Sequence, residues 1–187
     1  MNRGFVSHRR SRMAKAVIVV DMQKGFVDPQ GSLYGGESVR SIIPRLKERA
    51  ERERSDGAEI FFTQDSHAPD DEEFRMFPPH CVTGSRDEEI IDELSGLLSG
   101  ARIIKKRRYS AFFETDLAGQ LAALEPEEVV VMGVCTDICV LHTVADLRSR
   151  DYAVEVPADC VASFDAEQHE WALKHMEKIL GARITGR

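Results

Sequence analysis

The chain has 187 residues, and its 25 basic and 32 acidic side chains give a formal net charge of −7. This excess of acid argues against nucleic-acid binding, because contacts with a polyanion require surplus cations. Hydrophobic residues make up 42% and charged residues 30%, a balance typical of globular proteins. No apolar run approaches the roughly 20 residues of a membrane helix, and the first such run, 16–20, ends at Asp21. We therefore expect a cytoplasmic protein without nucleic-acid or membrane partners.

The first fifteen residues differ from the rest, because they carry five cations and no acidic side chain. A secretion signal is disfavoured, since the apolar run that follows is short and has no small-residue cleavage site after it. We expect residues 1–14 to form a disordered basic tail; the alternative is that translation starts at Met13. Residues 15–187 are expected to form a single domain.

Apolar, β-branched runs alternate with amphipathic segments along the chain. The runs are typical of strands buried on both faces of a parallel sheet, and they predict strands at 16–20, 59–63, 101–104, 128–134, 152–156 and 182–184. The segments between them predict helices at 38–54, 87–98, 116–124, 137–150 and 167–180. Pro44 marks either the start of the first helix or a bend in it. The alternation predicts an α/β fold with three layers: an open, mainly parallel sheet of five to six strands with helices on both faces.

Polar side chains follow several of these strands. Ligands in such folds bind beyond the carboxyl ends of the strands, so we expect Asp21, Asp65 and the segments after Ile104 and Val134 to meet at one edge. Taken alone, Asp21 is better explained as a turn residue or a helix cap. The four cations at 105–108 are typical of a solvated surface, although a lysine at a strand end can enter the same cleft.

The long segment 64–86 has no clear period and contains three prolines, and loops of this length are usually functional or disordered. It contains Asp65, His67, Glu73 and His80, whose oxygen and nitrogen donors suit zinc, iron or manganese. In an extended backbone Asp65 and His67 point to the same side. A solvated loop would show the same residue types, so the pattern alone leaves metal binding open.

The four cysteines are Cys81, Cys135, Cys139 and Cys160. They form no Cys-x-x-Cys pair, which disfavours a disulfide framework. Cys139 follows strand 128–134 at the start of a predicted helix with Thr136 as N-cap. Free N–H groups and the helix dipole there lower the pKa of a thiol and can hold an oxyanion. Cys139 is therefore the favoured nucleophile, whereas Cys135 has a packing role or, less favoured by geometry, a redox role.

Five motifs occur in one order along the chain: Val19-Val-Asp-Met-Gln23 with Phe26, Thr63-Gln-Asp-Ser-His67, Phe77-Pro-Pro-His-Cys81, Lys106 with Tyr109-Ser-Ala-Phe112, and Gly133-Val-Cys-Thr-Asp-Ile-Cys139. In these motifs the sequence resembles the isochorismatase-like cysteine hydrolases and, within them, the nicotinamidases. The resemblance spans about residues 16–185, nearly the whole chain.

The resemblance implies a catalytic triad with Cys139 as nucleophile, Asp21 as proton acceptor and Lys106 as the third member. It also implies a non-proline cis peptide bond between Val134 and Cys135. The backbone N–H groups of Cys135 and Cys139 would form the oxyanion hole.

The resemblance further implies one divalent metal ion, with zinc the first expectation and iron or manganese as alternatives. Its ligands would be Asp65, His67 and His80. Some nicotinamidases have another histidine between the last two, and this chain has none there; Glu73 resembles a ligand, or a residue just behind the ligands, in another branch. The substrate ring would lie among Phe26, Phe77, Tyr109 and Val134.

The implied reaction converts nicotinamide and water to nicotinate and ammonia through a cysteine thioester, a step of NAD salvage. A related amidohydrolase acting on another small carboxamide or on an N-carbamoyl or ureido compound is the alternative. The cysteine disfavours the isochorismatase branch, which lacks it. A non-catalytic binding domain is disfavoured because all three triad positions are filled. The sequence leaves open whether copies associate into a homo-oligomer.

Overall fold

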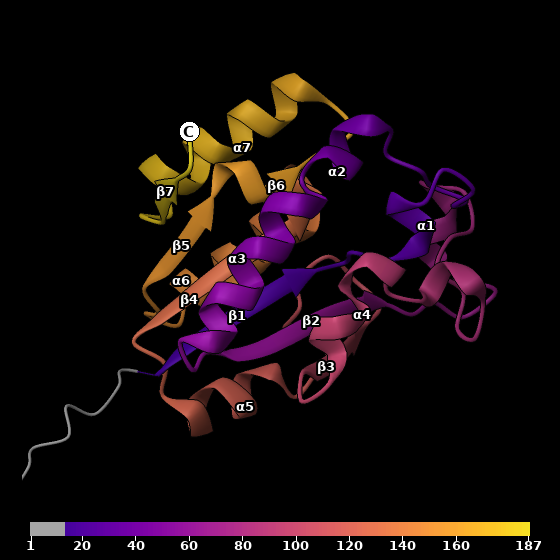
Figure 1. The fold of residues 1–187 in the computed structure, drawn as a ribbon. Helices are drawn as coiled ribbons and strands as arrows, with labels where there is room; N and C mark the ends of the chain where they lie inside the picture. The colour runs from indigo at the N-terminus through magenta and orange to yellow at the C-terminus, as the bar shows by residue number, and fades with distance from the viewer. Residues whose placement is uncertain (1–13) are drawn as a thin grey trace, which may run out of the picture.

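A parallel sheet runs through the computed structural model, which describes residues 14–187 (Figure 1). Its strands are β1 (Lys15–Val20), β2 (Glu59–Asp65), β3 (Arg102–Lys106), β4 (Glu128–Val134), β5 (Val154–Pro157), β6 (Val161–Ala162) and β7 (Arg183–Thr185). The order is β3-β2-β1-β4-β5-β7, and β6 pairs with β4. Each of these pairings is parallel. The expected fold is confirmed, with the two-residue β6 as an addition. The predicted basic tail lies outside the described residues, except for Ala14.

Helices cover both faces of the sheet (Figure 1). The α-helices are α1 (Lys24–Val27), α2 (Glu37–Ser41), α3 (Ile43–Ser55), α4 (Ser95–Leu98), α5 (Leu117–Leu124), α6 (Leu141–Arg148) and α7 (Ala166–Lys178). Successive strand side chains point to opposite faces, so Val17 of β1 packs in one core with Leu46 of α3 and Leu97 of α4. Ile18 packs in the other core with residues of α5, α6 and α7, such as Leu121 and Leu147. The three layers are therefore α1–α4, the sheet and α5–α7.

Two of the predicted helices, 38–54 and 87–98, are interrupted in the structure. Helix α2 ends at Ser41 and α3 begins at Ile43 with Pro44 in its first turn, as the proline indicated. The predicted helix 87–98 is wrong. It is replaced by the 3-10 turns η2 (Arg86–Glu88) and η3 (Asp92–Leu94) and the short α4. The backbone between the two turns is bonded to the segment after β1, because Lys24 N donates to Glu89 O and Ile91 N to Met22 O.

The remaining turns lie close to the ends of strands. They are the 3-10 turns η1 (Glu72–Arg75) and η5 (Ala158–Cys160) and the π-helical turn η4 (Thr136–Val140), which leads into α6. The expected N-cap role of Thr136 is wrong. Cys135 occupies the N-cap position without a side-chain bond, while the Thr136 hydroxyl is hydrogen-bonded to His169 Nδ1 at 2.9 Å.

The order of strands reverses between β1 and β4, because the chain builds outward from β1 to β2 and β3 and from β4 to β5 and β7. Such a reversal opens a crevice at the carboxyl ends of the two strands. Gly133 of β4 has φ of +116°, and a Cβ there would lie 2.1 Å from the Val20 carbonyl oxygen. Only glycine therefore lets β1 and β4 approach closely beside this crevice.

Candidate active site

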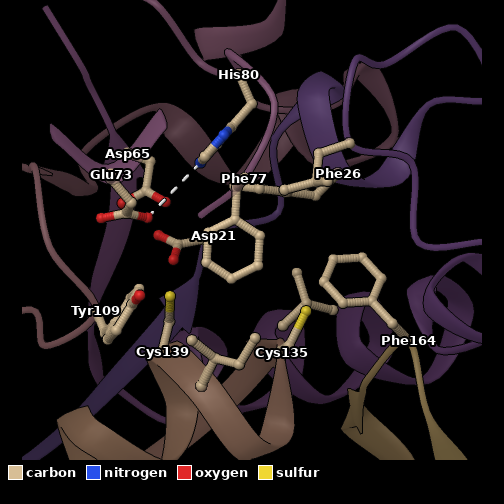
Figure 2. A pocket seen from close by; sticks show the side chains of 13 residues that line it. Asp21, Phe26, Asp65, Glu73, Phe77, His80, Tyr109, Cys135, Cys139 and Phe164 are labelled. Atoms are coloured by element: carbon tan, nitrogen blue, oxygen red, sulfur yellow. Dashed lines mark ion pairs between the residues drawn. The ribbon is translucent and has the colours of Figure 1, made fainter. Parts of the chain in front are cut away.

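Four polar side chains meet at the carboxyl ends of four neighbouring strands. Lys106 ends β3, Asp65 ends β2, Asp21 follows β1 and Cys139 lies in the turn after β4. Lys106 Nζ is 2.8 Å from Asp21 Oδ2 and 3.6 Å from Cys139 Sγ, and it also contacts Asp65 Oδ1. Figure 2 shows Asp21 beside the Cys139 thiol. The predicted convergence is confirmed, and the Lys106 ammonium provides the cation among Asp21, Asp65 and Cys139.

Two further polar residues hold Asp21 and Asp65 in place. Thr63 Oγ1 donates to Asp21 Oδ1 at 2.5 Å and accepts from the Asp21 backbone N–H at 3.1 Å. The buried Gln23 amide donates to Asp65 O at 2.9 Å and accepts from Asp65 N at 2.8 Å. Thr63 and Gln23 belong to two of the five sequence motifs, but their residue types alone predict no role for them. Their burial on apolar strand ends is the signal that identifies them, because buried polar groups are hydrogen-bonded.

Burial acts on the protonation of Asp21, Lys106 and Cys139. It raises the pKa of Asp21 above its ordinary value, although the Lys106 cation acts in the opposite direction. It opposes the charge on Lys106, but Asp21 and Asp65 outweigh it and the pKa of Lys106 lies well above its ordinary value. Burial also raises the pKa of the Cys139 thiol well above its ordinary value, against the attraction of Lys106. The expectation of a lowered thiol pKa is therefore wrong: Cys139 keeps its proton until a base removes it.

Three of the predicted metal ligands form a compact cluster. Asp65, His67 and His80 each offer a ligand atom, and these atoms lie within 4.8 Å of one another. Glu73, in η1, lies beside them with Oε1 3.9 Å from His80 Nε2. Both ring nitrogens of His67 and Oε2 of Glu73 are buried and make no aligned hydrogen bond, although Asp71 Oδ2 lies 3.3 Å from His67 Nδ1. Because such unsatisfied groups are costly, this donor set fits a divalent metal ion.

The charges around the cluster suit a cation. Burial lowers the pKa of His80, which favours the neutral ring that a metal ligand requires. Its Nδ1 is 2.8 Å from the Pro78 carbonyl oxygen, which can only accept, so Nδ1 carries the proton and Nε2 keeps its lone pair. Burial opposes a charge on His67, but the carboxylates of Asp65 and Asp71 outweigh it and raise the pKa of His67. The carboxylates around the His67 ring therefore favour a positive charge in the cluster.

A cavity that is partly open to solvent, with about 360 Å³ of empty space, lies between the thiol and the metal-ligand cluster. Figure 2 shows Cys139 and His80 on opposite sides of this space. The four residues predicted to surround the substrate ring all line it: Phe26, Phe77, Tyr109 and Val134. Three apolar residues that were not predicted also line it: Leu33, Ile138 and Phe164. Apolar positions in loops and at helix starts carry no sequence signal that distinguishes a pocket wall from ordinary packing. The cavity is suited to a small, flat, apolar molecule with one polar end.

Lys106 and His67 lie behind the cavity wall and are completely buried as side chains. Lys106 contacts the lining residues Asp21, Asp65 and Cys139, and His67 lies beside Asp65. The expected cis peptide bond between Val134 and Cys135 is present. Cys135 itself lines the cavity, and the four cysteines are free thiols.

The sequence profile of the isochorismatase domain matches residues 15–187, and the chain belongs to this family. It is 35% identical over 182 residues to the uncharacterized isochorismatase family protein PncA of Bacillus subtilis (strain 168), covering 92% of this chain and 100% of that protein. The class of the protein is thus an isochorismatase-like hydrolase. None of the helices in residues 14–187 is long and apolar enough to cross a membrane.

Three solved structures are close neighbours. The nicotinamidase PncA from Bacillus subtilis superposes with a TM-score of 0.87 at 35% identity, covering 91% of this chain and 98% of that one. The pyrazinamidase of Pyrococcus horikoshii in complex with zinc gives 0.84 at 33%, covering 92% and 99%. N-carbamoylsarcosine amidase from Thermoplasma acidophilum gives 0.83 at 32%, covering 92% and 96%. These similarities confirm the resemblance to nicotinamidases within the isochorismatase-like superfamily.

Proposed function

We propose that the protein is a nicotinamidase that converts nicotinamide and water to nicotinate and ammonia, a step of NAD salvage. The observation that carries the proposal is the arrangement of one cavity with the Cys139–Lys106–Asp21 triad on one side and the Asp65–His67–His80 cluster on the other. The similarity to a nicotinamidase and to a zinc-bound pyrazinamidase supports it.

In this mechanism Asp21 accepts the Cys139 proton as the sulfur attacks the amide carbon. The Lys106 ammonium, 2.8 Å from Asp21, stabilises the negative charge in this buried site. The backbone N–H groups of Cys135 and Cys139 hold the oxyanion. The C–N bond then breaks, and Asp21 returns its proton to the departing ammonia. Water, deprotonated by Asp21, cleaves the thioester, and the proton goes back to the Cys139 sulfur.

Asp65, His67 and His80, with Glu73 beside them, would hold one divalent ion, for which zinc is the first choice. When bound, such an ion supplies a Lewis-acid contact for the ring nitrogen of the substrate. The apolar walls made by Phe26, Phe77 and Tyr109 then place the ring between the cluster and the thiol. Holding the amide beside the nucleophile lowers the barrier by removing the entropy of encounter.

The test measures ammonia release from nicotinamide by wild type, by chelated wild type and by Cys139→Ala. We expect chelation to reduce the rate and metal to restore it, and Cys139→Ala to lose about 10⁴-fold or more in kcat. Cys160→Ala is the matched control, because Cys160 is also buried but lies outside the cavity. Ammonia release that persists in Cys139→Ala would reject the mechanism.

A second candidate is hydrolysis of an N-carbamoyl compound, favoured by the similarity to N-carbamoylsarcosine amidase. The two candidates differ in their use of the metal-ligand cluster, because an N-carbamoyl amino acid has no ring nitrogen to place there. Turnover of N-carbamoylsarcosine that survives chelation, without turnover of nicotinamide, would favour the second candidate. Turnover of nicotinamide that is lost on chelation, without turnover of N-carbamoylsarcosine, would support the first candidate.

A further inference from the structure

The run of four cations at 105–108 has a carboxylate partner at each position. The pairs are Lys105 with Glu88, Lys106 with Asp21 and Asp65, Arg107 with Glu114, and Arg108 with Asp71. Arg108 is directed toward the loop that carries the metal-ligand cluster. We propose that Asp71, held by Arg108, is a positioning residue that orients His67 for metal binding. The inference rests on the metal site of the proposed function.

Each oxygen of Asp71 has a polar neighbour. Oδ2 lies 3.3 Å from His67 Nδ1, while Oδ1 accepts from Arg108 Nη1 at 2.8 Å and from the Glu73 backbone N–H at 2.9 Å. The Asp71 side chain is only 6% exposed, and that of His67 is completely buried. The carboxylate is thus fixed from two sides, with its second oxygen facing the His67 ring.

The direction of this contact determines which nitrogen of His67 is available. Histidine ligands commonly donate one ring N–H to a carboxylate or carbonyl, which leaves the other nitrogen for the metal. His80 follows this pattern with the Pro78 carbonyl at Nδ1. With Asp71 at its Nδ1, His67 presents Nε2 to Asp65, whose Oδ2 is 3.8 Å away. The two histidines therefore direct the same type of nitrogen into the cluster, each through a different acceptor.

Asp71 also caps η1 through Oδ1, and a purely structural role must be separated from the orienting role. Asp71→Asn makes this separation, because its amide oxygen can still accept from Arg108 and Glu73. The amide NH₂ then faces His67 Nδ1 and, being a donor, disfavours a proton there. The substitution keeps the cap of η1 and reverses which ring nitrogen of His67 is favoured to carry the proton.

The experiment measures the zinc dissociation constant by competition with a chromophoric chelator. We expect Asp71→Asn to weaken binding about 10- to 100-fold, and the urea midpoint of the chelated protein to stay at the wild-type value. Asp70→Asn is the matched control, since it removes the same charge from an exposed neighbour; its zinc affinity should equal that of wild type. Arg108→Met should weaken zinc binding less, and the double variant should show less than the sum of the two effects.

Rescue gives a second readout. Excess zinc should restore the ammonia release of Asp71→Asn and leave Cys139→Ala inactive, because only the former has lost metal occupancy. Wild-type zinc affinity in Asp71→Asn would overturn this inference and leave the proposed function standing. A wild-type protein that binds none of zinc, iron or manganese would instead overturn the metal site of the proposed function, and this inference with it.

Discussion

Replacing Lys106 with methionine removes one cation from between two carboxylates while keeping a side chain of similar length. Lys106 is completely buried as a side chain and contacts both Asp21 and Asp65. Removing one partner of a buried ion pair costs about 3–5 kcal/mol, because the remaining charge is left without compensation. We expect a loss of this size in the free energy of unfolding at neutral to alkaline pH.

The loss should depend on pH in a definite direction. In the wild type, the Lys106 cation opposes the effect of burial on both carboxyls, and it helps to hold the pKa of Asp65 below its ordinary value. In Lys106→Met burial is no longer opposed in this way, and the pKa values of Asp21 and Asp65 both rise. A carboxyl whose folded pKa is raised is protonated without penalty at low pH, and its contribution to stability is lost as pH rises through that pKa. Each unit of the shift corresponds to about 1.4 kcal/mol. Lys106→Met should therefore be closest to wild type near the acid end and furthest from it near the alkaline end.

The assay is urea unfolding of chelated wild type and Lys106→Met at about pH 5 and about pH 8. Lys105→Met is the matched control, because Lys105 is more than half exposed and its partner Glu88 keeps hydrogen bonds from the Ser66 hydroxyl and the Gly84 backbone N–H; its cost should stay below about 1 kcal/mol. A cost below about 1 kcal/mol for Lys106→Met at the alkaline end, or a cost that does not change with pH, would refute the reasoning.

Three further predictions follow from the site. The apparent pKa of the acid limb of kcat/KM should lie above the ordinary aspartate value, because burial raises the pKa of Asp21 and only the carboxylate can accept the thiol proton. A pH–rate profile with nicotinamide measures this pKa, and a value at or below 3.8 contradicts the prediction. Gly133→Ala should cost about 3 kcal/mol or more in urea unfolding, because its Cβ meets the Val20 carbonyl, whereas Gly119→Ala in an open helical position should be neutral or stabilising. Phe164→Ala should raise KM for nicotinamide about 3- to 10-fold with little change in kcat, the loss of roughly 1 kcal/mol of ring contact; an unchanged KM would remove Phe164 from the binding wall.

Much of the fold follows from local pattern. The β-branched runs identify the strands because burial on both faces leaves no polar period, and the polar residues that end them predict the edge where Asp21 and Lys106 meet. Asp65 is found the same way. The spacing of isoleucine and leucine at 87–98 is helical and predicts a helix there. The helix does not form as a whole, because Glu89 and Ile91 form backbone hydrogen bonds with the segment after β1.

Other features depend on assembly and leave no local trace. The raised pKa of Cys139 is caused by burial under several elements, whereas the sequence shows only its place at the start of a helix. Asp71 lies in a run of four acidic residues that is typical of a solvated loop. Its partner Arg108 is distant in sequence, and only the fold brings the two together. Phe164 likewise becomes part of the cavity wall only after the chain has returned to β4.

The placement of one residue of the candidate site at each of four neighbouring strand ends has a consequence for folding. Lys106, Asp65, Asp21 and Cys139 come from distant parts of the chain, and they meet only when β3, β2, β1 and β4 are paired in order. Closing such non-local pairings is the slow part of folding a parallel sheet. No single supersecondary unit holds Asp21, Lys106 and Cys139 together, so the proposed catalysis requires the complete four-strand pairing. Recovery of activity during refolding therefore reports the assembly of the central sheet.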